Sequence, residues 1–131
     1  MYLLDTNICI YVIRRRPTHV VDRLIAHDPR EVAISSVTLA ELEFGVEKST
    51  AQIRNRAALE LFLAPLQVLA FDAGAAKRYG AIRADLERKG RPIGGLDLMI
   101  AAHALAVEAI LVTNNPREFT RVPRLRIENW A

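Results

Sequence analysis

Cysteine, secretory signals and long apolar runs are all scarce or missing in this chain of 131 residues. Cys9 is the only cysteine, so the chain has no partner for an internal disulfide and no second thiol for a zinc cluster. The longest apolar stretch, residues 98–112, contains His103 and Glu108 and is too short for a membrane span. Asp5 interrupts the apolar start, so we expect no secretory signal. These features favour a reducing compartment, and we expect the protein in the cytoplasm.

Motifs for nucleotide and thiol chemistry are missing as well. The glycine pair at residues 94–95 lacks the spacing of a phosphate-cradling loop, and no Walker sequence is present. No base lies near Cys9 in the sequence, so a small buried side chain is expected there. His19, His27 and His103 share no metal-ligand spacing, and we expect His103 to be packed or solvent-facing. The chemistry must therefore come from acidic residues.

Composition and charge indicate a globular protein with an acidic partner. With 51% hydrophobic and 25% charged residues, the chain resembles ordinary folded proteins, and its length predicts one domain over residues 1–131. The net charge of +3 and pI near 9.4 favour nucleic acid as the partner, with an acidic protein second. Arg14, Arg15 and Arg16 form a basic run that we predict to bind nucleic acid, unless it is only a solvated helix end.

Strand and helix patterns alternate along the chain. Short apolar strands are expected at residues 2–4, 32–34, 68–71, 110–113 and 124–128. Helical spacing follows the first strand, then runs from residue 17 to 28, 37 to 48, 53 to 62, 73 to 89 and from 97 onward. This α/β alternation predicts a mostly parallel sheet covered by helices on both faces.

Three carboxylates are placed where such a fold brings side chains together. Asp5 follows the first strand, Glu41 lies on the third helix, and Asp97 lies in the first turn of the last long helix. Ligand sites of parallel sheets lie at the carboxyl ends of the strands, where residues 113–115 also end a strand. Magnesium prefers such hard oxygen ligands. We therefore predict a divalent-metal site formed by these acids.

Each acid also has a simpler interpretation. Asp5 can serve only as a helix cap, a role that contributes about 1 kcal/mol. Asp97 can be a first-turn acid favoured by the helix macrodipole. Glu41 can be a helix-surface acid, although it lies about 200° around the axis from Glu43, toward the buried face. Alone each acid is weak support, and the three together are stronger.

Three ordered motifs give the chain a family resemblance. They are Leu4-Asp5-Thr6-Asn7, the run Ile34-Ser35-Ser36-Val37-Thr38-Leu39-Ala40-Glu41-Leu42 with Gly45, and Asp97-Leu98-Met99-Ile100-Ala101-Ala102. With these motifs the chain resembles PIN-domain VapC toxins of type II toxin-antitoxin systems, in particular the enteric-type VapC subgroup. The resemblance extends through residues 113–115, 118–119 and 126–130, and so covers essentially the whole chain.

The resemblance implies a PIN-like three-layer α/β/α sandwich and an endoribonuclease dependent on Mg²⁺ or Mn²⁺. It also implies a cognate VapB-like antitoxin and tRNA as the target class. The metal-binding acids correspond to Asp5, Glu41 and Asp97. Residues expected to orient these acids or water are Thr6, Asn7 and Thr113. Asn115 lies where many relatives carry a fourth acid, and it is included among the catalytic candidates although an amide adds no charge and cannot act as a base.

Two other functions and a dimer are also considered. The chain can be a catalytically weak regulatory subunit of an antitoxin–DNA complex, or a related PIN nuclease acting on structured DNA. Metal-dependent cleavage of RNA by the antitoxin-free chain distinguishes a ribonuclease from the regulatory subunit, and parallel digestions of RNA and DNA distinguish it from the DNA nuclease. Apolar helical stripes favour a homodimer, with Ile53, Leu61 and Leu63 as candidate interface residues that can equally be core.

Overall fold

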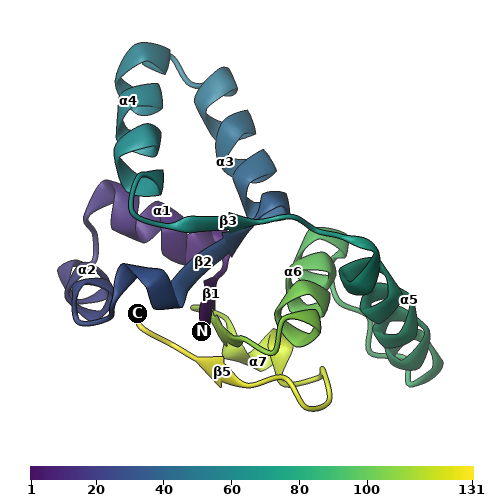
Figure 1. Ribbon diagram of the computed structural model, residues 1–131. Helices are drawn as coiled ribbons and strands as arrows, with labels where there is room; N and C mark the ends of the chain where they lie inside the picture. Colours follow the sequence, from purple (N-terminus) through teal and green to yellow (C-terminus); the bar gives the residue numbers. More distant parts are fainter.

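A five-stranded parallel sheet forms the centre of the computed structural model, which describes residues 1–131 (Figure 1). The strand order is β3-β2-β1-β4-β5, and every neighbouring pair is parallel. The strands are β1 (Tyr2–Leu4), β2 (Val32–Ser35), β3 (Gln67–Leu69), β4 (Ile110–Val112) and β5 (Ile127–Glu128). The predicted parallel α/β sheet is confirmed.

Seven α-helices and one short 3₁₀ helix connect these strands. They are α1 (Thr6–Arg14), α2 (Thr18–Ile25), η1 (Pro29–Glu31), α3 (Ser36–Lys48), α4 (Gln52–Leu63), α5 (Ala73–Arg88), α6 (Gly95–Ala106) and α7 (Pro116–Phe119). Polar side chains at the strand ends begin several of them. Ser35 accepts a hydrogen bond from the amide of Val37, and Asp72 accepts one from the amide of Ala75.

Two apolar clusters fill the space on the two faces of the sheet. Leu4 belongs to the cluster with side chains of α1 to α4, whereas its neighbour Leu3 belongs to the cluster with side chains of α5, α6 and α7. This alternation follows from the two-residue period of a strand. The helices therefore cover both faces, as the three-layer α/β/α sandwich requires. In Figure 1, α3 and α4 project together away from the sheet, and α5 and α6 lie on its other side.

Several predicted boundaries were wrong. The third strand covers residues 67–69 rather than 68–71, the fourth ends at Val112, and the fifth contains only residues 127–128. Helix α7 was not predicted, because four residues are too few to show a helical period. The amide of Thr113 still donates to the carbonyl of Glu128 at 2.9 Å, so the sheet ladder reaches one residue past β4.

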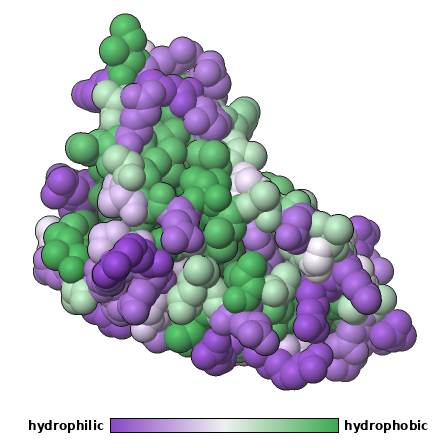
Figure 2. Space-filling model, viewed as in Figure 1, coloured by the Kyte–Doolittle hydropathy of each residue, from purple (hydrophilic) through white to green (hydrophobic).

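Large apolar side chains remain exposed on the projecting α3–α4 pair. Phe44 is 65% exposed, Ile53 90% and Leu61 72%, whereas Leu63 is partly buried against the core. Figure 2 shows apolar surface gathered over this part of the molecule. Two of the three dimer candidates thus lie on the surface, and Leu63 belongs largely to the interior. None of the helices has the length and apolar character needed to cross a membrane.

Candidate active site

Asp5 lies at the carboxyl end of β1 and is only 5% exposed. Its Oδ1 atom accepts a hydrogen bond of 2.9 Å from the amide of Ile8, which makes it the N-cap of α1. Burial raises its pKa and the charge of Glu41 adds to the rise, while hydrogen bonds from Thr113 and Ile8 oppose it. The capping role is therefore real, and it coexists with an environment that disfavours the negative charge.

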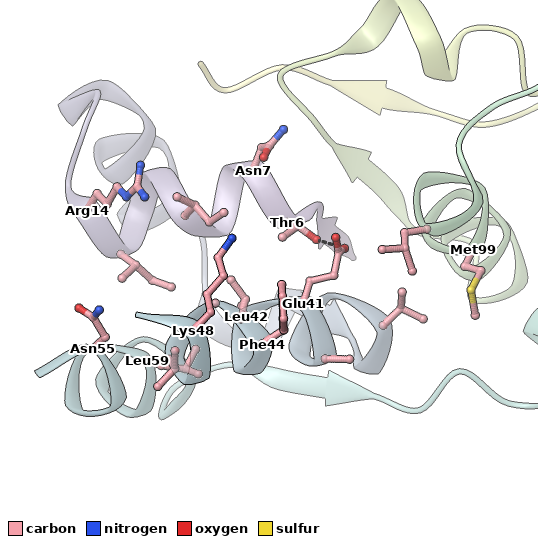
Figure 3. A pocket seen from close by; sticks show the side chains of 17 residues that line it. Thr6, Asn7, Arg14, Glu41, Leu42, Phe44, Lys48, Asn55, Leu59 and Met99 are labelled. Carbon is pink, nitrogen blue, oxygen red and sulfur yellow. Dashed lines mark hydrogen bonds between the residues drawn. The ribbon is translucent and has the colours of Figure 1, made fainter. Parts of the chain in front are cut away.

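Glu41 is held by a residue from another element. Thr6, the first residue of α1, donates its hydroxyl to Oε1 of Glu41 across 2.6 Å, and Figure 3 shows these two side chains pointing at each other. The Thr6 hydroxyl also lies 3.3 Å from that of Thr38. Thr6, which the sequence predicted to orient the acids, thus contacts the carboxylate of Glu41. Glu43, by contrast, pairs with Arg56 at 2.6 Å and faces away from this edge.

Asp97 lies in the first turn of α6, and its pKa is raised from 3.8 to about 6. Burial is the main cause, followed by the charges of Glu118, Asp5 and Glu41 and a hydrogen bond with Glu118. Because charges that raise the pKa of a carboxyl must lie near it, Glu118, Asp5 and Glu41 share the surroundings of Asp97. The structure thus brings the three predicted acids to one edge of the sheet.

Glu118 on α7 was missed by the sequence reasoning. Its Oε2 atom accepts a hydrogen bond of 2.9 Å from Nδ2 of Asn115, and its Oε1 lies 3.4 Å from the amide of Gly94. It is also the strongest charged neighbour of Asp97. An acid three positions after Asn115 meets it across one helical turn, so recognition of α7 would have revealed it. Asn115 itself is exposed and bound to this acid.

The acids are not gathered into a closed metal cage. No group of three His, Cys, Asp or Glu side chains is arranged to hold a metal ion. Glu41 is bound to Thr6, and Asp5 caps α1. The available donors are all oxygens, and this set suits a hard divalent cation such as magnesium.

The other predicted polar residues lie at the rim of the acidic edge. Asn7 is exposed, and its Nδ2 lies 3.5 Å from Oδ1 of Asn114, whose amide in turn donates to the hydroxyl of Tyr11 at 2.9 Å. Figure 3 shows Asn7 directed away from the Thr6–Glu41 pair. Arg14, Arg15 and Arg16 are exposed at the end of α1, and none of them forms a salt bridge.

His103 and Cys9 have packing roles, as expected. His103 is 1% exposed, and its Nδ1 lies 2.7 Å from the hydroxyl of Ser35. Burial lowers its pKa, which favours the neutral ring. Cys9 is fully buried, and burial followed by the charge of Asp5 raises the pKa of its thiol, which disfavours the reactive thiolate.

An apolar groove of about 940 Å³ opens beside Glu41. Side chains of α1, α3 and α4 line it, together with Leu96 and Met99 from α6 (Figure 3). Most of the lining is hydrophobic, and Arg14 and Lys48 supply positive charge. The acidic edge is therefore continuous with a surface suited to an amphipathic partner.

Comparisons with known proteins agree with this architecture. The PIN domain family matches residues 2–125. The chain is 46% identical to "Ribonuclease VapC2" of Rickettsia felis, and 49% identical to "tRNA(fMet)-specific endonuclease VapC" of Salmonella typhimurium, with 99% of this chain and 98% of each relative covered. Among solved structures, VapBC2 from Rickettsia felis bound to a promoter DNA fragment and DNA-bound VapBC from Salmonella typhimurium each match with a TM-score of 0.94. Their identities are 45% and 48%, with 99% of this chain and 98% of each matched chain covered.

Proposed function

This chain belongs to the PIN-domain family, and we propose that it is the endoribonuclease toxin of a VapBC toxin-antitoxin module. We further propose that residues 1–131 act as a single PIN-like domain. The observation that carries the proposal is the set of carboxylates around Asp97, whose pKa is raised to about 6 by burial and by the charges of Glu118, Asp5 and Glu41. Because the relatives are named as a ribonuclease and an endonuclease, hydrolysis of a phosphodiester bond is the reaction that we assign to this acidic edge.

Asp5, Glu41 and Asp97 are the proposed metal-binding residues, with Glu118 as a fourth acid. The oxygen-only donor set fits magnesium, and manganese is the alternative ion. A bound divalent cation would neutralise charge on the scissile phosphate and lower the pKa of a water molecule. Thr6 would hold the carboxylate of Glu41 in place through its 2.6 Å hydrogen bond.

Asn115 and Thr113 would act on the acids rather than on the reacting atoms. Asn115 donates to Glu118 at 2.9 Å, and Thr113 hydrogen-bonds Asp5. The hydrogen bond from Thr113 opposes the rise in the pKa of Asp5, and that from Asn115 fixes the position of the Glu118 carboxylate. Asn7, which bonds to Asn114 at the rim, is better suited to contact the substrate than to orient the acids.

Transfer RNA in the cytoplasm is the proposed substrate, by analogy with the relative whose name specifies tRNA(fMet). Arg14, Arg15 and Arg16 lie at the end of α1 away from Asp5, are exposed and form no salt bridge, which leaves them available for phosphate contacts. Such contacts would orient the RNA without reading its bases. Binding that stays unchanged when the three arginines are replaced at low salt would contradict this role.

A VapB-like antitoxin and a second copy of the chain are the proposed protein partners. The similar solved structures are VapBC complexes, and the apolar groove beside Glu41 suits an amphipathic antitoxin segment that would cover the acids. Ile53 and Leu61 on α4 are 90% and 72% exposed and suit a homodimer contact. A monomer at micromolar concentration in sedimentation would contradict the homodimer.

The test is cleavage of purified tRNA by the antitoxin-free chain with magnesium, with chelator, and with the Asp5→Asn variant. We expect cleavage to require magnesium and to fall more than a hundredfold in Asp5→Asn, while circular dichroism stays unchanged. Asp22→Asn, an exposed change on α2, is the matched control and should retain full activity. Structured DNA is digested in parallel. Preferential DNA cleavage would contradict the ribonuclease, and no cleavage of either would favour a regulatory subunit.

A further inference from the structure

A second pocket, of about 400 Å³, lies at the opposite end of the sheet from the acids. Arg78 of α5 lines it together with Arg124 and Arg126, which precede β5, and Glu108 is its only acid. Ala104 and Leu105 in the last turn of α6 and Ala109 just before β4 also line it, whereas Asp97 lies in the first turn of α6. Eight residues of helix separate the two sites by roughly 12 Å along the axis. In Figure 1 the yellow C-terminal segment runs below α6 on this side.

The arginines of this pocket are not used for internal pairing. None of the salt bridges in the chain includes Arg78, Arg124 or Arg126. One nitrogen of Arg126, Nη2, donates to the backbone carbonyl of Glu108 at 2.7 Å, and the carbonyl of Arg126 accepts from the amide of Leu111. Arg126 is thereby fixed in position while its remaining N–H donors stay available.

The backbone at Arg124 is held in a conformation that an arginine does not favour. Its φ angle is +66°, in the left-handed region where glycine or asparagine costs less. An exposed arginine at such a position offers the fold nothing that asparagine would not supply. The guanidinium of Arg124 lines the pocket and is exposed, so it is not needed for core packing.

We propose that Arg78, Arg124 and Arg126 bind a phosphate of the RNA substrate at a distance from the cleavage site. Guanidinium groups bind phosphate through paired, charge-assisted hydrogen bonds, and three of them outweigh the single carboxylate of Glu108. A folded RNA is large enough to reach both ends of α6, so this contact would select long, structured substrates over short ones. The inference rests on the proposed ribonuclease function and adds a substrate-selecting site to it.

The test measures RNA binding in the Asp5→Asn background, where no cleavage interferes. At 0.15 M salt the Arg78→Gln/Arg124→Asn pair should weaken binding of folded tRNA about tenfold and reduce the salt slope of log K by about 1 to 2. A six-nucleotide RNA should bind unchanged. Glu108→Gln should tighten tRNA binding about twofold, because it removes the one negative charge of the pocket.

Matched controls separate this site from general electrostatics and from folding. Arg54→Gln/Arg88→Gln removes the same charge from exposed positions outside the pocket that form no salt bridge, and should change tRNA binding less than threefold. Arg124→Asn alone should leave thermal stability equal or higher, since it relieves the left-handed strain. A loss on tRNA no larger than in the control pair would overturn the proposal.

Other outcomes would also overturn it. An equal loss on the six-nucleotide RNA or on duplex DNA would exclude a site for folded RNA. Reduced affinity for the antitoxin with RNA binding unchanged would reassign the pocket to a protein contact. Failure of the unmutated chain to cleave any RNA would refute the ribonuclease function instead, and the binding measurements would still decide whether the pocket holds phosphate.

Discussion

Replacement of Asp97 by asparagine should stabilise the metal-free protein at neutral pH. The pKa of Asp97 is raised from 3.8 to about 6, so the folded state binds its proton more tightly than the unfolded state does. The stability that this group contributes is therefore full below about pH 4 and is lost as pH rises through about 6. At pH 7.5 the folded protein holds an ionised carboxylate in an unfavourable place, and the asparagine variant does not.

The size of the effect follows from the shift and its surroundings. A shift of about two pKa units corresponds to an upper limit of about 3 kcal/mol. Asp97 is only half-buried, so solvent screening lowers this limit, and the lost interaction with the amino end of α6 removes about 0.3–1 kcal/mol more. We expect a gain of about 1–2 kcal/mol, which for a chain of 131 residues raises Tm by roughly 4–7 °C.

Thermal unfolding between pH 4 and pH 8, with chelator present, measures this directly. The Tm of Asp97→Asn should exceed that of the unmutated chain by an amount that grows between pH 4 and 6 and stays constant above pH 7. For Asp22→Asn, an exposed change on α2, the Tm difference from the unmutated chain should not depend on pH in this way. Magnesium should then raise the Tm of the unmutated chain and leave that of Asp97→Asn unchanged. An asparagine variant that is equally or less stable at every pH would refute the reasoning.

Two further predictions concern the hydrogen bonds around the acids. Thr6→Val keeps the shape of the side chain but removes the 2.6 Å hydrogen bond to Glu41. The rate of single-turnover RNA cleavage should therefore fall about tenfold, and a Thr6→Ser variant, which keeps the hydroxyl, should retain most of the unmutated rate. If Thr6→Val cleaves at the unmutated rate, Thr6 does not position this acid. Ser35→Ala removes both the N-cap of α3 and the 2.7 Å partner of buried His103, and should lower the free energy of unfolding in urea by about 2–4 kcal/mol. A loss below 1 kcal/mol would mean that neither bond contributes as described.

The parallel sheet was predictable because its signals are local and repeated. Apolar segments of three or four residues, each followed by a helical pattern, leave a parallel α/β arrangement as the simplest solution. The same logic predicted that Asp5, Glu41 and Asp97 meet at the carboxyl edge. Exact strand ends were not predictable, because hydrogen bonds between distant segments set them, such as that from the amide of Thr113 to the carbonyl of Glu128.

Glu118 shows what a sequence pattern leaves out. Its helix has only four residues, and its importance comes from Asp97, 21 positions earlier, whose pKa it raises across a tertiary contact. No local period marks such a residue. The basic pocket at the other end of α6 was missed for the same reason, because Arg78 and Arg124 come together only through the fold.

The carboxylates at the acidic edge are not explained by the stability of the fold. Burial raises the pKa values of Asp5 and Asp97, and the charge of Glu41 adds to both rises, so both carboxylates cost stability when ionised. Asparagine at position 5 could also cap α1, and asparagine at position 97 could occupy the first turn of α6, without the free-energy cost of a buried charge. Hydrogen bonds from Thr113 and Ile8 nevertheless hold the carboxylate of Asp5 in place, and Thr6 holds that of Glu41. The cation proposed above would offset this repulsion, and the stabilisation predicted for Asp97→Asn measures how much the ionised carboxylate costs the metal-free fold.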